Sequence, residues 1–391
     1  LLYQLDSRVR LRYLHTPFFV WAMGWWLLSS LIQIDAYVEN PVIALLLLSL
    51  LTAAPLVYLD RVRNWCWLPA SISTALMLPL LIAIALIAIM RNDHILLFAD
   101  SPFWFAALAF NYWIIVKLED VDWPAVVFRV LHTGFLVFIV CLLSFELSWQ
   151  FYETVAAAGD GFIALLTIVP LLALYRVRVA GFPAIARLGK PLQISMIGAL
   201  GLLLTLWSLS VNFSSNANPT PLPYFPFVNP VDLAHLIFFI SMIRTKSLFE
   251  AEYGYLRKPL FILLGGLAFI WISAVLLRSM HFYLDIPYHL TSLLNSAKIQ
   301  TAISILWAVI GMLSMLFGSR KSIRPVWIAG SGLVSLVLVK MFFIDLSASG
   351  TIERIISFLV VGGLLVAMGY FSPIPGKAGQ DKGTLPDVKH V

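Results

Sequence analysis

The chain has 391 residues, of which 61% are hydrophobic and only 12% are charged, and its mean hydropathy is +0.92. Soluble domains carry about 25% charged residues, so this composition excludes a soluble globular protein. The net charge of +6 comes from Lys and Arg in short loops and does not indicate nucleic-acid binding. The two cysteines, Cys66 and Cys141, lie in apolar runs and exclude a disulfide framework.

Apolar runs of membrane-spanning length recur along the whole chain. A run of about 20 apolar residues is long enough to cross a bilayer as a helix, and lipid leaves helices as the only way to satisfy the backbone of such runs. We therefore predict an all-α polytopic bundle of about twelve transmembrane helices, with a range of ten to twelve. In chain order the spans are 16–35, 41–59, 66–90, 102–117, 124–145, 157–175, 191–212, 230–244, 259–278, 298–318, 325–345 and 353–371.

The gaps between these runs are alternately basic and free of Lys and Arg, with exceptions at Arg91 and at Arg278 and Lys298. The gaps at 146–161 and 212–232, for example, contain no Lys or Arg. Basic loops stay on the cytoplasmic side of a membrane, so the alternation predicts that both termini are cytoplasmic. The basic gaps hold Arg61, Arg63, Arg176, Arg178, Arg187, Lys190, Arg244, Lys246, Arg257, Lys258, Arg320, Lys321 and Arg324.

The first candidate segment on the opposite face is 218–235, NPTPLPYFPFVNPVDLAH. Its five prolines forbid a regular helix before about Val231. They alternate with Tyr224, Phe225 and Phe227, and the helix that follows carries Asp232 and His235. The segment fits either an apolar wall of a ligand site or a rigid plug that seals the bundle.

The second segment is 278–298, RSMHFYLDIPYHLTSLLNSAK. A spacing of four would place His281, Asp285 and His289 on one helix face, but Pro287 breaks that register. We expect a short interfacial helix between residues 288 and 296. These side chains and Arg278 are compatible with proton exchange, metal binding or a structural role. The signal for metal binding is weak, so we assign no metal and no cofactor.

The third segment is 340–357, KMFFIDLSASGTIERIIS. Lys340 lies inside an apolar run, where a charge is costly and needs a partner. It either extends outward toward Asp345 or Glu353, or holds an anionic headgroup together with Arg354.

Motifs of two enzyme classes are missing from the sequence. It contains neither G-x-x-x-x-G-K-[ST] nor G-x-S-x-G. ATP hydrolysis through a P-loop and a serine-hydrolase nucleophile elbow therefore have no support.

Three stretches together resemble one family: PLPYFPFVNPVDLAH, the stretch from LLRSMHFYLDIP to SMLFGSRK, and KMFFIDLSASGTIERIISFLVVGGLLVAMGYFSPIP. Their ordered combination resembles the domain-of-unknown-function 2339 family of bacterial predicted polytopic membrane proteins. The resemblance covers residues 120–375 well and the first hundred loosely. Members of that family are usually longer, which implies that this chain is a C-terminal portion. Met280-His281 stands where the family often has two histidines, which weakens a paired-histidine site.

We therefore expect one transmembrane bundle over residues 1–375 and a flexible cytoplasmic tail over 376–391, in a bacterial inner membrane. The leading functional hypothesis is non-catalytic: binding or moving an envelope lipid, glycan-lipid or amphipathic solute at a periplasm-facing site. Arg278, Lys340 and Arg354 would hold an anionic headgroup, and Tyr224, Phe225 and Phe227 would line the apolar part. The alternatives are a transferase acting on a lipid-linked donor, with His281 or Asp285 as base, and a membrane scaffold. Expected partners are membrane lipids and not nucleic acid, and protein partners stay open.

Overall fold

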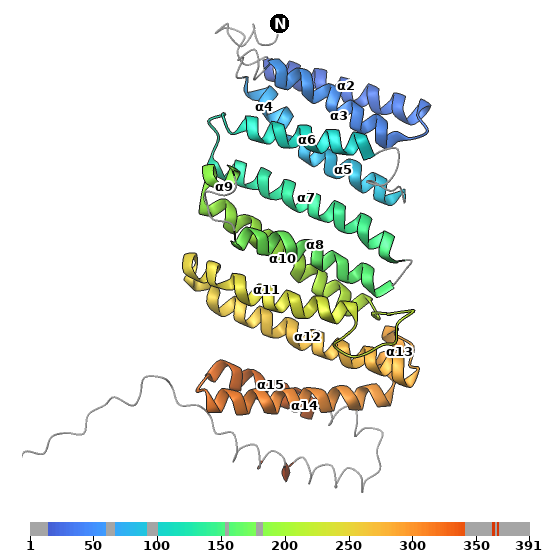
Figure 1. Cartoon of the computed structure of the whole chain (residues 1–391), viewed down its shortest axis with the longest axis vertical. Coiled ribbons are helices and arrows are strands. Elements are labelled where there is room, and N and C mark those ends of the chain that lie inside the picture. Colours follow the sequence, from blue (N-terminus) through green and yellow to red (C-terminus); the bar gives the residue numbers. More distant parts are fainter. Residues whose placement is uncertain are drawn as a thin grey trace, which may run out of the picture. The chain divides into compact units, whose positions relative to one another are not determined.

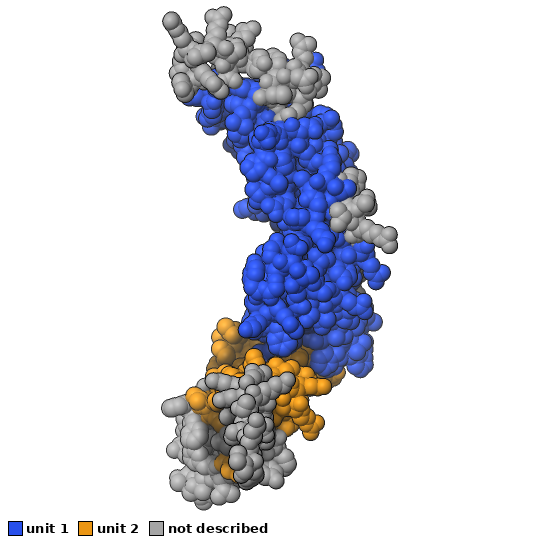
Figure 2. Space-filling view, turned by 90° about the vertical axis from the view of Figure 1, so that its left-hand side faces the viewer, with its two compact units in different colours: residues 1–271 blue, residues 272–391 orange. Residues whose placement is uncertain are grey.

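A computed structural model of the chain describes residues 15–59, 67–91, 101–152, 156–176 and 183–340, together with 362–363 and 366. Within these ranges every regular element is a helix, and long helices run back and forth (Figure 1). Two compact units divide the chain between Trp271 and Ile272 (Figure 2). Because that boundary falls inside one helix, α12, the backbone continues from one unit into the other without a linker.

The first unit contains most of the helices. These are α2 (His15–Tyr37), α3 (Pro41–Val57), α4 (Leu68–Ala75), α5 (Met77–Met90), α6 (Ser101–Leu118), α7 (Ala125–Tyr152), α8 (Ala156–Arg176), α9 (Pro183–Leu188), α10 (Lys190–Ser214), α11 (Pro230–Glu252), the short 3-10 turn η3 (Gly254–Leu256) and the first half of α12 (Arg257–Leu284). The second unit contains the end of α12, then α13 (Leu290–Asn295), α14 (Ala297–Arg320) and α15 (Arg324–Lys340).

Local sequence explains where several helices begin. Asn40 and Asn229 each accept a hydrogen bond from a backbone N–H of the first turn, and a proline follows each of them. A side-chain acceptor at this position and a proline just inside the helix are the standard N-terminal signals. Gly189, which starts α10, has a φ of 74°, a backbone conformation that glycine adopts without strain.

The first unit has two adjoining apolar cores. One is formed mainly by α3, α5, α6 and α7 around side chains such as Leu46, Leu81 and Trp104. The other is formed by α7 to α12 around side chains such as Leu171, Leu200 and Phe238. Helix α7 contributes to both, so it joins the two halves of this unit.

Several basic residues of the first unit lie at one end of its helices. Arg176 ends α8, Arg187 lies on α9, Lys190 starts α10 and Arg257 starts α12. Figure 1 shows these helix ends on the same side of the unit. We call this side the basic end of the unit. Its composition agrees with the alternation of loop charge in the sequence.

The predicted spans between residues 16 and 318 all fall on helices, with three differences in detail. The span at 66–90 is two helices, α4 and α5, which meet at Leu76. The cause is Pro79, because it has no N–H to donate to the Ala75 carbonyl and its ring clashes with that carbonyl. Span 230–244 continues to Glu252, and span 124–145 continues to Tyr152. Glu146, expected at the end of its span, therefore lies inside α7 and is buried.

Eight helical stretches among the described residues are long and apolar enough to cross a membrane. Helix α3 is apolar but shorter than that criterion requires. The fold is thus an all-helical membrane-type architecture. The total of twelve spans and the cytoplasmic termini remain predictions. Span 325–345 is described as far as Lys340, where α15 ends, and of span 353–371 the structure describes residues 362, 363 and 366 alone.

Candidate functional site

Asp232 is the centre of a buried hydrogen-bond network in the first unit. One carboxylate oxygen, Oδ1, accepts from Trp271 Nε1 at 2.9 Å. The other, Oδ2, accepts from Asn229 Nδ2 at 2.5 Å and from the backbone N–H of Phe227 at 3.2 Å. Asn229 Oδ1 in turn accepts from the Asp232 backbone N–H at 3.0 Å. The carboxylate therefore joins the chain before α11, α11 itself and α12.

These donors explain how a fully buried Asp232 is tolerated. An unpaired carboxylate inside an apolar bundle would cost many kcal/mol, whereas donors aimed at both oxygens replace lost water. Asp232 also lies in the first turn of α11, where the helix dipole favours a negative charge. It thereby positions the non-helical segment 215–229 against the helices.

His235, one turn further along α11, is also fully buried. Its Nδ1 donates to the Val231 carbonyl at 2.9 Å, because a carbonyl oxygen can only accept. Its Nε2 lies 3.0 Å from Asn212 Nδ2 and 3.1 Å from Ser208 Oγ. Nε2 therefore accepts, and the imidazole is the neutral tautomer with its proton on Nδ1.

Two tryptophans enclose this imidazole. The Trp271 ring is parallel to it, with centroids 5.7 Å apart and an interplanar angle of 3°. The Trp207 ring is tilted by 36° to the imidazole, at a centroid distance of 4.5 Å. Trp207 Nε1 donates to the Asp160 carbonyl at 2.8 Å. His235 is thus a well-bonded part of the packed interior.

The aromatic residues predicted to line a ligand site divide into two groups. Tyr224 is 7% exposed, whereas Phe225 is 57% exposed and Phe227 is 44% exposed. Phe227 has a φ of 65° and packs edge-on against Trp271 at a centroid distance of 5.6 Å. Only the two phenylalanines present an apolar surface outward.

Four further predicted residues lie in the second unit. Arg278, on α12, is fully buried, and His281, one turn later, donates from Nδ1 to the Ile286 carbonyl at 2.7 Å. Asp285 follows the end of α12 with a φ of 53°. His289 precedes α13. The helix end before Pro287 and the short helix after it confirm that these side chains do not share one helix face.

Lys340 is the last residue of α15 and is partly buried. Its ammonium donates to the Gln300 carbonyl at 2.9 Å and to Ser304 Oγ at 2.6 Å, both on α14. These partners are neutral. Its predicted partners Asp345 and Glu353 lie outside the described residues, as does Arg354, which was predicted to hold the headgroup with it.

Helices α14 and α15 approach each other closely at glycines. A Cβ added to Gly330 would lie 2.6 Å from the Gly311 carbonyl oxygen, and one added to Gly318 would lie 2.6 Å from the Trp327 backbone nitrogen. Such small residues let membrane helices pack backbone to backbone. The hairpin that carries Lys340 is therefore tightly joined.

A second polar group lies at the basic end of the first unit. His132 Nε2 is 2.7 Å from Glu119 Oε1, and Arg187 Nη1 is 2.9 Å from Glu119 Oε2. The His132 and Glu119 side chains are 2% and 8% exposed, whereas Arg187 is 47% exposed. Glu119 therefore joins the turn after α6 to α7 and to the short helix α9.

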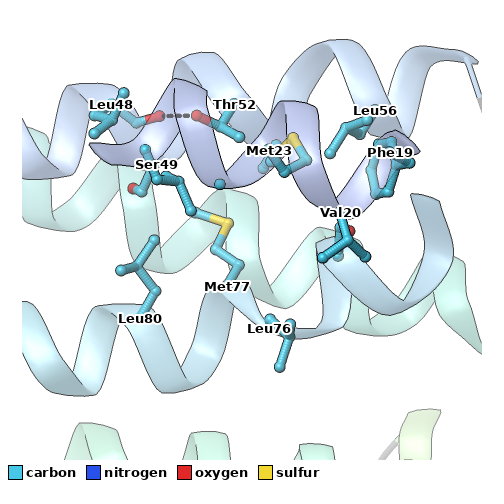
Figure 3. A pocket seen from close by; sticks show the side chains of 14 residues that line it. Phe19, Val20, Met23, Leu48, Ser49, Thr52, Leu56, Leu76, Met77 and Leu80 are labelled. Carbon is cyan, nitrogen blue, oxygen red and sulfur yellow. Dashed lines mark hydrogen bonds between the residues drawn. The ribbon is translucent and has the colours of Figure 1, made fainter. Parts of the chain in front are cut away.

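An apolar cavity of about 430 Å³ lies among α2, α3, α4 and α5 (Figure 3). Its wall includes Phe19, Met23 and Leu56, and it also includes Leu76 and Met77 at the junction of α4 and α5. This volume is within the range of ligand pockets.

The hydroxyl groups in this wall do not offer polar contacts to the cavity. Ser49 Oγ donates to the Leu46 carbonyl at 2.7 Å, Thr52 Oγ1 to the Leu48 carbonyl at 2.7 Å, and Ser73 Oγ to the Pro69 carbonyl at 2.8 Å. Each bond is made within the residue's own helix. The cavity is consequently suited to a hydrocarbon chain.

Sequence reasoning missed the partners of Asp232 and His235. Trp207, Ser208 and Asn212 are near one another on α10, and their spacing of one helical turn was the available signal. Metal chemistry has no candidate in the part of the chain that the structure describes, where no group of three or more His, Cys, Asp or Glu side chains could hold a metal ion.

Long apolar helices and a basic end define this chain as a polytopic α-helical membrane protein. It belongs to the family described as predicted membrane protein (DUF2339), whose sequence pattern it matches over residues 7–375. No curated protein matches the chain. No solved structure matches it either.

Proposed function

We propose that this protein binds or moves an envelope lipid, glycan-lipid or amphipathic solute in a bacterial inner membrane, at a site facing the compartment opposite the basic loops. The observation that carries the proposal is the position of Lys340. It ends α15 beside Gln300 and Ser304 near the start of α14, at the opposite end of the hairpin from Arg320 and Arg324.

Among the described residues the hydrogen-bond partners of Lys340 are neutral, so its ammonium still needs a counter-charge. A cation within an apolar helix pair is costly and usually marks a functional site. An ammonium carries three protons, and among the described residues two neutral oxygens accept from it. A phosphate or carboxylate headgroup would supply both the counter-charge and a further acceptor. Arg278 and Arg354 are the proposed additional bases.

The apolar cavity among α2 to α5 supports the same class of ligand. Its hydroxyls are hydrogen-bonded to their own helices and, in Thr52, also to Trp26 Nε1 of α2, so its interior favours an acyl chain over a sugar or an ion. The segment 215–229 adds exposed apolar area through Phe225 and Phe227. Both features favour an amphipathic ligand.

A transferase receives less support from these contacts. A general base needs a free lone pair near the substrate. In His235 the Nε2 lone pair accepts from α10 and the ring is enclosed by tryptophans. The His281 Nδ1–H donates to the Ile286 carbonyl, which fixes the ring without involving Nε2, so the argument from hydrogen bonding against a general base applies to His235 and not to His281.

The experiment is a lipid-movement assay on the full chain in liposomes. Phosphatidylglycerol carrying a dithionite-sensitive fluorophore is the probe, and the rate of its transfer between leaflets is measured. We expect transfer above that of protein-free liposomes, reduced about tenfold in Lys340→Gln because a charge-assisted hydrogen bond is lost. The matched control is Lys298→Gln, an exposed lysine on the first turn of α14. Equal rates in the two variants would reject the site.

A scaffold is the second candidate, favoured by the exposed apolar side chains of the segment 215–229. These are Leu222, Phe225, Phe227 and Val228. A photo-crosslinking residue in place of Phe225 distinguishes the two functions. Lipid adducts support a ligand site, whereas protein adducts of one defined mass support docking of a partner.

A further inference from the structure

A second apolar hollow, which we call the α10–α12 groove, lies in the first unit among α10, α11, η3 and the start of α12. Its volume is about 340 Å³. The wall contains Gly198 and Gly201 from α10, Met242 and Phe249 from α11, and leucines from η3 and α12. On α10 it runs from Ile197 to Thr205, which is about 12 Å at 1.5 Å per residue.

Small residues on α10 create the groove. A Cβ added to Gly201 would lie 3.7 Å from the Met242 side chain, and one added to Gly198 would lie 3.5 Å from the Phe249 ring. Both are ordinary contact distances, so a larger side chain at either position would project into the hollow. Its lining is almost wholly apolar, which excludes a polar solute as occupant.

Lys246 is the charged residue of this wall. It lies near the C-terminal end of α11, at the basic end of the unit, and its side chain is 37% exposed. Its ion pair with Glu250 is loose, with an N···O distance of 3.6 Å on the same helix. Such exposed pairs contribute little, so the ammonium remains available to a stronger anion.

The surroundings of Lys246 are basic and aromatic. Arg244, Arg257 and Lys258 are exposed, so residues 244–258 hold four bases against the two acids Glu250 and Glu252. Tyr255 is 76% exposed beside Tyr253. Tyrosines and Lys or Arg at helix ends mark the level of the lipid headgroups. One end of the groove therefore lies at headgroup level and the remainder extends into the span.

We propose that the α10–α12 groove binds an anionic phospholipid from the leaflet at the basic end. One acyl chain occupies the hollow over Gly198 and Gly201, and Lys246 holds the headgroup phosphate. Charge complementarity decides the occupant, because basic pockets between membrane helices on the side of the basic loops select anionic headgroups. The site is separate from Lys340 and does not depend on the function proposed for it.

The test measures lipid contact by electron paramagnetic resonance. The full chain is placed in phosphatidylcholine nanodiscs with a small fraction of spin-labelled phosphatidylglycerol or, in parallel, spin-labelled phosphatidylcholine. We expect the motionally restricted fraction to favour phosphatidylglycerol. Lys246→Gln should reduce that preference about tenfold, since it removes a charge-assisted contact. Arg244→Gln removes the same charge from an exposed position outside the groove and should change the preference by less than about twofold.

Filling the groove provides the second arm. Gly201→Leu should lower the restricted fraction for both lipids, whereas Gly332→Leu should leave it unchanged, because a Cβ at Gly332 has nothing within 4 Å. Lys246→Gln decides the matter if Gly201→Leu does not fold. The proposal is overturned if Lys246→Gln and Arg244→Gln behave alike, or if Gly201→Leu alters only self-association.

Discussion

The imidazole of His235 and the indole of Trp271 lie parallel, 5.7 Å apart, and the same indole donates its N–H to the buried carboxylate of Asp232. One tryptophan on α12 thus contacts both buried titratable residues of α11. The Trp271 ring packs over His235, and its Nε1–H donates a hydrogen bond to the Asp232 carboxylate.

Trp271→Phe should test this double role. The phenyl ring keeps part of the stacking on His235 but leaves Asp232 Oδ1 without the indole donor, which should cost about 1.5–3 kcal/mol for a bond to a charged group. Thermal unfolding of the purified protein measures the loss. Trp25→Phe is the control, because Trp25 is 56% exposed on α2. Equal losses in the two variants would contradict the assignment.

The tautomer of His235 should be visible by nuclear magnetic resonance. With ¹⁵N-labelled histidine, His235 should show a protonated Nδ1 and an unprotonated Nε2, because Val231 O accepts and Asn212 donates. His235→Gln identifies the signal by its loss. An Nε2–H signal for His235 would require a reversed amide at Asn212 and would remove the argument that the ring is closed to proton transfer.

The contact between α14 and α15 offers a matched pair of glycine substitutions. In Gly330→Ala the new methyl group would lie 2.6 Å from a backbone oxygen of Gly311, so the helices must separate, at a cost of about 1–3 kcal/mol. Gly332→Ala meets open space and should be neutral or slightly stabilising. Limited proteolysis of the second unit reports the difference. Similar protection in both variants would mean that the hairpin packs differently.

The carboxylate of Glu119 should matter more than its exposed partner. Glu119→Gln removes the negative charge and one of the two acceptor oxygens that serve His132 and Arg187. Because the Glu119 and His132 side chains are nearly buried, the cost should be about 2 kcal/mol. Arg187→Ala should cost under about 1 kcal/mol, because its side chain is 47% exposed. Denaturant unfolding in mild detergent compares the two, and the reverse order would show that α9 is held mainly by Arg187.

Topology can be tested by side-specific labelling. In a variant with Cys66 and Cys141 replaced by serine, we expect Tyr255→Cys at the basic end and Phe225→Cys in the segment 215–229 to react with a membrane-impermeant maleimide from opposite sides. Both positions are exposed. Reaction from one side only would disprove the topology inferred from the loop charges.

The positions of the helices could be predicted from the sequence because hydropathy is a local property. The run before Pro41 ends at a polar, proline-containing gap, and the run after Pro230 begins at one. The structure retains both gaps as helix boundaries. Hydropathy gave no warning of the junction at Leu76, since Pro79 lies within a uniformly apolar run.

The contacts of the candidate site could not be predicted in the same way. Asp232 and His235 stood out because charge is rare in membrane helices. Asn212 lies 23 residues from His235, and Trp271 lies 39 residues from Asp232. Helices that are apolar on every side give no periodic signal of which faces meet. Proximity of such residues is therefore a result of packing that only a structure provides.

The junction at Leu76 gives the cavity of Figure 3 a hinged wall. Leu76 separates α4 from α5, and with Ser73, Met77 and Leu80 it also lines the cavity. Because residues on both sides of Leu76 line the cavity, the backbone angles at this one residue set how far the Leu80 side of the wall lies from the Ser73 side.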